Sequence, residues 1–112
     1  MGLSIERSDG ILIAMADGRV DGANAQEFQG DLTDAIDPTD RAVVLDLGEI
    51  TYISSAGLRV ILLMARALKR QDAELAVCSL SAPIREVFEI SGFDKIIPVR
   101  DSRPDAIASF KT

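Results

Sequence analysis

Residues 42–47 constrain the fold of this chain more than any other segment. Their sequence, Ala-Val-Val-Leu-Asp-Leu, is β-branched and apolar at nearly every position. A strand with one solvated face alternates apolar and polar side chains, whereas a strand covered on both faces reads as a continuous apolar run. The segment therefore predicts a central strand in a sheet with helices packed against it, which is the arrangement of an α/β domain.

The segments 24–36 and 54–70 flank this strand and carry apolar residues three or four positions apart. That spacing is typical of a helix with one buried face. Pro38 follows the first segment and ends it, because proline cannot continue a helix. Lys69 and Arg70 close the second segment, where cations interact favourably with the negative end of the helix dipole. We predict one helix before the central strand and one after it.

The remaining segments complete an alternating order of strands and helices. The patterns predict strands at 3–7, 11–16, 74–78 and 95–99, a loop at 19–24, and helices from Ser81 to Gly92 and after Ser102. Pro98 favours an edge position for the last strand, because proline cannot donate to a ladder. This order implies an α/β fold with a mixed, largely parallel sheet of about five strands and about four helices.

Length and charge limit the kind of protein this can be. The chain has 112 residues, enough for one hydrophobic core, so we expect a single domain over residues 1–112. An acidic residue, Glu6, lies near the start and no long apolar run follows, so we expect neither membrane insertion nor a signal peptide, and a cytoplasmic location. The formal net charge of −6 argues against a nucleic-acid binder and favours a protein partner.

The residue types exclude several chemistries. The chain has no histidine, which removes Ser-His-Asp and Cys-His catalysis and every histidine metal site. Its single cysteine, Cys78, lies in an apolar stretch and is interpreted as a buried strand thiol. We therefore expect no metal, no cofactor and no intrinsic enzymatic activity.

The segment 47–59, between the central strand and the next helix, is the part of the chain that can carry chemistry. A nucleophile elbow needs Gly-x-Ser-x-Gly, and Ile53 stands where the first glycine belongs. The glycines and Lys-Ser/Thr pair of a phosphate-binding loop do not occur. Two interpretations stay open: Ser55 accepts a phosphate at the positive end of the helix, or Ser54 or Ser55 only caps the helix, contributing about 1 kcal/mol.

Four segments of the chain form a recognisable set: residues 18–21 (Gly-Arg-Val-Asp), 43–47, 52–63 and 88–93. They span nearly the whole chain, and the Ser-Ser-Ala-Gly-Leu block at 54–58 is their most specific part. Together and in this order they resemble a STAS domain, and more narrowly the bacterial anti-sigma factor antagonists.

The resemblance implies a STAS fold and a partner-switching function. Family members bind an anti-sigma factor that is also a serine kinase, and that kinase inactivates them by phosphorylation, which a serine phosphatase reverses. The acceptor position falls on Ser55, and the family commonly has aspartate where this chain has Ser54. The partner-binding residues that the resemblance implies here are Asp21, Asn24, Ser54, Ala56, Gly57 and Arg59, although Arg59 also fits a plain solvent-facing residue.

Two further functions are compatible with a STAS domain. The chain could be a permanently bound subunit of a transport complex, or a scaffold in a larger sensory assembly, with Ser55 a helix cap in either case. A receiver domain is excluded, because the paired acidic residues expected after the first strand are missing. Substitution of Ser55 by aspartate or alanine separates the partner switch from the other two functions.

Overall fold

The computed structural model describes residues 2–111, which form a five-stranded mixed sheet. β1 (Gly2–Ser8) and β2 (Ile11–Val20) form an antiparallel hairpin, and β3 (Ala42–Ile53), β4 (Glu74–Cys78) and β5 (Val99–Arg100) follow in parallel. The strands lie side by side in chain order, with β3 at the centre. The predicted mixed, largely parallel sheet is confirmed.

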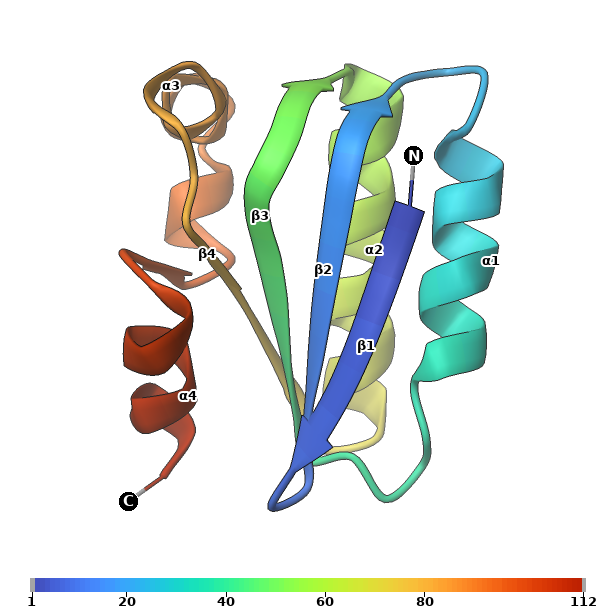
Figure 1. The fold of residues 1–112 in the computed structure, drawn as a ribbon, viewed down its shortest axis with the longest axis vertical. Coiled ribbons are helices and arrows are strands. Elements are labelled where there is room, and N and C mark those ends of the chain that lie inside the picture. Colours follow the sequence, from blue (N-terminus) through green and yellow to red (C-terminus); the bar gives the residue numbers. More distant parts are fainter. Residues whose placement is uncertain (1, 112) are drawn as a thin grey trace.

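Helices cover both faces of this sheet, as the apolar central strand predicts. α1 (Ala25–Ala35) and α2 (Ser55–Arg70) pack against each other and against one face, and α4 (Arg103–Phe110) packs against the other (Figure 1). α3 (Ala82–Ile90) follows β4 and adds Phe88 to the core shared with α1 and α2. The four helices of the described chain match the predicted number.

The core divides at the central strand. Val43, Leu45 and Leu47 of β3 belong to the cluster that includes α1 and α2, whereas Val44 belongs to the smaller cluster under α4. Alternate residues of a strand point to opposite faces, so a strand buried on both faces must be apolar throughout. Cys78 also lies in the smaller cluster with no exposed surface, and burial raises the pKa of its thiol. The predicted strand thiol is confirmed as a core residue.

β2 and β3 both extend beyond their predicted ends. β2 continues to Val20 instead of residue 16, and β3 continues to Ile53 instead of residue 47. The prediction of a loop beginning at residue 19 is therefore wrong for its first two residues. The pairing of the two strands shifts register after Met15 and again after Gly18. Such irregularities break the alternation by which strands are recognised in a sequence.

The predicted strand at 95–99 is wrong over most of its length. A short 3-10 helix, η1 (Phe93–Lys95), begins after Gly92, whose φ of 75° is a left-handed conformation that favours glycine. The turn buries Ile97 in the core and leaves Ile96 exposed. Only Val99 and Arg100 pair with β4, and they do so at the predicted edge of the sheet.

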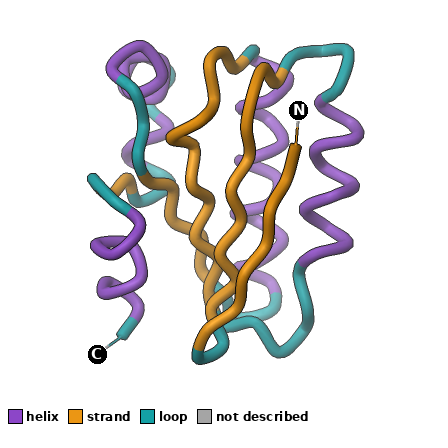
Figure 2. The backbone as a smooth tube through the Cα atoms, viewed as in Figure 1, coloured by secondary structure: helices purple, strands orange, loops and turns teal. Residues whose placement is uncertain are grey.

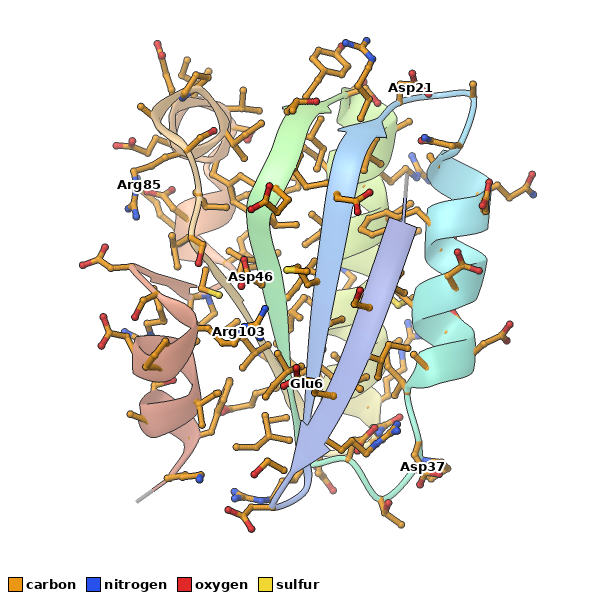
Figure 3. The ribbon with its side chains drawn as sticks, in the orientation of Figure 1. Glu6, Asp21, Asp37, Asp46, Arg85 and Arg103 are labelled. Atoms are coloured by element: carbon orange, nitrogen blue, oxygen red, sulfur yellow. The ribbon has the colours of Figure 1, made fainter. Side chains whose placement is uncertain are left out.

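A buried carboxylate fastens the hairpin to the connection between α1 and β3. Asp40 accepts two hydrogen bonds from the Arg7 guanidinium, both 2.9 Å long, and a third from the backbone N–H of Asp37 at 2.8 Å. The Arg7 hydrogen bonds hold the pKa of the Asp40 carboxyl below its usual value. Asp37 lies at the end of the sheet opposite to Asp21 (Figure 3), so this cluster is a structural fastening away from the candidate site.

Candidate functional site

The carboxyl ends of β2 and β3 meet at one edge of the sheet and place the predicted site residues there. Val20 pairs with Ile53 in the last register position, and the backbone N–H of Ser54 donates to the Val20 carbonyl at 2.8 Å. The connection from β2 to α1 and the junction from β3 to α2 therefore lie at the same end of the molecule (Figure 2). We refer to residues 19–24 and 52–59 together as the Ser55 edge.

Ser54 caps α2. Its backbone is extended, and its side-chain oxygen accepts a hydrogen bond from the backbone N–H of Gly57 at 3.3 Å. This is the usual role of serine at the residue before a helix. The sequence left open whether Ser54 or Ser55 provides the cap, and the structure assigns it to Ser54. The interpretation of Ser55 as the helix cap is therefore wrong.

Ser55 is the first residue of α2, and its side chain is exposed. Its hydroxyl forms no side-chain hydrogen bond with any residue in the range 2–111. The first N–H groups of a helix have no partner within the helix and carry partial positive charge, and the first turn of α2 has no acidic side chain. This position can present a hydroxyl to an incoming phosphate donor and can tolerate the phosphate afterwards.

Gly57 lets the start of α2 press against the ends of both strands. A Cβ atom at this position would lie 2.8 Å from Val20 Cγ1 and 2.8 Å from Ile53 Cγ1. Both distances are shorter than any normal contact between carbon atoms. Gly57 is buried, and its missing side chain fixes where Ser54 and Ser55 lie.

Asp21 and Asn24 build the turn that leads from β2 into α1. The Asn24 side chain accepts from the backbone N–H of Asp21 at 2.9 Å and donates to the Arg19 carbonyl at 2.8 Å. Asp21 in turn accepts from the backbone N–H of Ala23 at 3.0 Å, and its side chain is 35% exposed. Asn24 thus holds the turn, whereas Asp21 presents a carboxylate at its surface (Figure 3).

Sequence reasoning missed a stacked pair at this edge. The Arg19 guanidinium lies 4.3 Å from the centre of the Tyr52 ring, and Arg19 Nε is 4.0 Å from the nearer Asp21 oxygen. Tyr52 is 42% exposed. The sequence signal for this pair is that the chain's single tyrosine lies two residues before the block at 54–58, but a predicted loop at 19–24 gives Arg19 no cross-strand partner.

Ala56 and Arg59 complete the predicted set on α2. Ala56 is half-buried against the larger core cluster, and Arg59 is exposed one helical turn after Ser55. The structure therefore brings the predicted residues from two chain segments to one edge. Of these side chains, Ser55 and Arg59 are the most open to solvent, whereas Asn24, Ser54 and Gly57 support the local backbone.

Within residues 2–111, no group of three or more cysteine, aspartate or glutamate side chains has an arrangement that could hold a metal ion. Among the described helices, none combines the length and the apolar character required to span a bilayer.

The chain is similar to known proteins over nearly its whole length. Residues 3–106 match the STAS domain family. The chain is 51% identical over its full length to the Bordetella bronchiseptica protein BtrV, which is described as an anti-sigma factor antagonist, and the match covers 97% of that protein.

Solved structures share the fold. An anti-sigma factor antagonist from Mycobacterium paratuberculosis superimposes with a TM-score of 0.90 at 20% identity, over 99% of this chain and 94% of that chain. The Bacillus cell fate determinant SpoIIAA in its phosphorylated form superimposes with a TM-score of 0.73 at 16% identity, over 98% of this chain and all of that chain. The order of elements, the packing around β3 and the match to residues 3–106 lead to one conclusion: the chain belongs to the STAS domain family.

Proposed function

We propose that this chain is an anti-sigma factor antagonist that binds an anti-sigma factor through the Ser55 edge. The full-length identity with BtrV supports the class of function, because the match leaves no large part of either chain uncovered. The observation that carries the proposal is that the two adjacent serines differ in role: one caps the helix and the other is exposed. Ser54 caps α2, so the exposed hydroxyl of Ser55 has no structural task and is available for modification.

Phosphorylation of Ser55 turns this binding off. The anti-sigma factor is itself the serine kinase in this account, and a serine phosphatase restores the binding form in the cytoplasm. The antagonist needs no catalytic group of its own, because the kinase supplies the base and the metal-bound nucleotide. The phosphorylated form of SpoIIAA, which shares the fold, supports a phosphorylated state in this family.

The electrostatics of the Ser55 edge explain why one phosphate is sufficient to weaken binding of the partner. Phosphorylation adds a charge of about −1.5 to −2 at neutral pH. Asp21, which carries a further negative charge, directly follows Val20, whose carbonyl accepts from the backbone N–H of Ser54 at 2.8 Å. A partner surface desolvated against a neutral hydroxyl must then accommodate a buried phosphate. A hundredfold loss of affinity requires only about 2.7 kcal/mol, so no refolding is needed.

The remaining edge residues form the surface around the acceptor. Asp21, Ala56 and Arg59 contact the partner directly in this proposal, whereas Asn24, Ser54 and Gly57 hold the turn and the helix start in place. The exposed Tyr52 adds an aromatic contact of the kind enriched at interface hot spots. Such residues give the partner both a charged and an apolar anchor.

The test is to incubate the purified chain with ATP and extract of its source cells, and then to localise added phosphate by mass spectrometry. Ser55→Ala and Ser54→Ala provide a matched pair, because the two serines are adjacent. We expect one phosphate on the parent chain and on Ser54→Ala, and none on Ser55→Ala. A parent chain that stays unmodified in extract that phosphorylates a control substrate contradicts the switch and favours a constitutive subunit.

A further inference from the structure

Arg59 is a cation without a partner at the Ser55 edge. It is exposed, and none of the ion pairs formed within residues 2–111 includes it. The other arginine at this edge, Arg19, already lies over Tyr52 and beside Asp21. Arg59 thus has a guanidinium that no other side chain in this range engages and whose donors are available to an anion.

The dipole of α2 does not stabilise a cation at Arg59. It is the fifth residue of α2, in the half of the helix nearer the positive end of the dipole, whereas Lys69 and Arg70 occupy the last turn, where cations are stabilised. The first turn of α2 has no acidic side chain with which Arg59 could pair. A cation in this position gains nothing from the dipole, but it can pair with an anion placed one turn before it.

Ser55 is four residues before Arg59, which places both on the same face of α2. The Cβ atoms of residues four apart on a helix are about 5–6 Å from each other, and an anion on the N-terminal side of a cation is the better orientation. A serine hydroxyl brings no charge to this pair. A phosphoserine brings about −1.5 to −2, together with oxygens that match the donor geometry of a guanidinium.

We infer that Arg59 binds the phosphate on Ser55 and so acts as a positioning residue for the inactivated state. In the unphosphorylated chain its guanidinium is free to pair with a carboxylate of the partner. In the phosphorylated chain it is held against residue 55. Phosphorylation then adds negative charge to the surface and also withdraws the positive group that a partner carboxylate would meet.

This inference rests on the proposed phosphorylation of Ser55 for its biological meaning, but its test does not need the kinase. Phosphoserine is installed at position 55 during translation, and the second ionisation of its phosphate is followed by phosphorus NMR. The same titration is carried out with Arg59→Gln and with Arg66→Gln. Arg66 is a matched control, because it is an exposed arginine of α2 about 16 Å along the helix axis from Ser55.

We expect Arg59→Gln to raise the pKa of the phosphate by about 0.2–0.4, the value that corresponds to an exposed pair of about 0.2–0.5 kcal/mol. Arg66→Gln should leave the pKa of the phosphate unchanged. Arg59→Lys keeps the positive charge, so the pKa of the phosphate should stay close to that of the parent. Asp21 and Arg19 are present in every variant, so the difference isolates Arg59.

An equal pKa in the parent and in Arg59→Gln, or an equal rise in Arg59→Gln and Arg66→Gln, would overturn the inference. The proposed function fails independently, by absence of phosphate on Ser55 after incubation with ATP and active extract. A low phosphate pKa that depends on Arg59 would stand even in that case, because the phosphoserine was installed without the kinase.

Discussion

Gly57 lies so close to Val20 that a single methyl group at Gly57 would be 2.8 Å from Val20 Cγ1. The same methyl group would be 2.8 Å from Ile53 Cγ1 on the neighbouring strand. Neither atom is the far end of a long flexible side chain, so neither can move away cheaply. The contact sets the position of the first turn of α2, and with it the position of Ser55.

Gly57→Ala should therefore lower the free energy of unfolding by about 1–3 kcal/mol, the usual cost of overpacking a well-packed site. Gly30→Ala is the matched control, because a Cβ at Gly30 in the middle of α1 would meet nothing within 4 Å. That substitution should raise the free energy of unfolding by about 0.5–1 kcal/mol, since alanine favours a helix. Urea denaturation measures the free energy of unfolding of both variants. A change of the same sign in Gly57→Ala and Gly30→Ala would contradict the proposed packing.

Ser54→Ala should lower the free energy of unfolding by about 0.5–1 kcal/mol, because it removes the oxygen that caps Gly57. Ser54→Asp should leave the free energy of unfolding within about 0.5 kcal/mol of the parent, since aspartate caps as well as serine. Thermal unfolding followed by circular dichroism compares the three chains. If Ser54→Ala unfolds at the temperature of the parent, the cap contributes nothing.

Asp40→Asn should destabilise the chain by about 1–2 kcal/mol at neutral pH, because it weakens the hydrogen bonds from Arg7. The folded pKa of Asp40 lies below its ordinary value of 3.8, so the ionised carboxylate stabilises the fold above pH 4 or so. That stabilisation is lost as the pH falls through the folded pKa.

The stability difference between the parent and Asp40→Asn should accordingly shrink below about pH 4. Asp34→Asn, at an exposed position of α1, serves as the control for removal of one negative charge. Denaturant titrations at pH 7 and pH 3 give the measurement. A difference that is the same at both pH values would exclude the ionised Asp40 carboxylate as its source.

Ser55→Ala should retain affinity for the anti-sigma factor. The exposed Ser55 hydroxyl makes no hydrogen bond within residues 2–111, so its removal should leave the structure of the binding surface unchanged. Ser55→Asp should weaken binding, since a carboxylate places part of the charge of a phosphate at the same position. Binding is measured by calorimetry with the purified partner. Equal affinities for the two variants would contradict a charge-controlled switch.

The central strand and the two helices beside it could be predicted because each of these segments follows a single hydrophobic pattern along its whole length. The run from Ala42 to Leu47 has no face that tolerates water, and residues 24–36 and 54–70 repeat at helical spacing, so local pattern and tertiary burial agree. Ser54 could be predicted only as one of two candidate caps. The structure decided between them, since the pairing of Val20 with Ile53 fixes where the strand ends.

The strand extensions and the segment after Gly92 could not be predicted from local pattern. Arg19 and Tyr52 are exposed residues at a register shift, so neither alternation nor an apolar run identifies them as strand partners. Ile96 and Ile97 have high strand propensity, but the 3-10 turn places them on opposite sides, with Ile97 in the core and Ile96 in solvent. Tertiary contacts override propensity in such short segments.

The affinity of the anti-sigma factor for the chain with serine and with phosphoserine at position 55 tests the central claim most directly. Isothermal titration calorimetry of both forms, with Ser55→Ala as the unmodifiable reference, gives the ratio of dissociation constants. We predict that phosphorylation weakens binding by about a hundredfold or more, which corresponds to at least about 2.7 kcal/mol. Equal affinity of the two forms would contradict the proposal that Ser55 controls this partner.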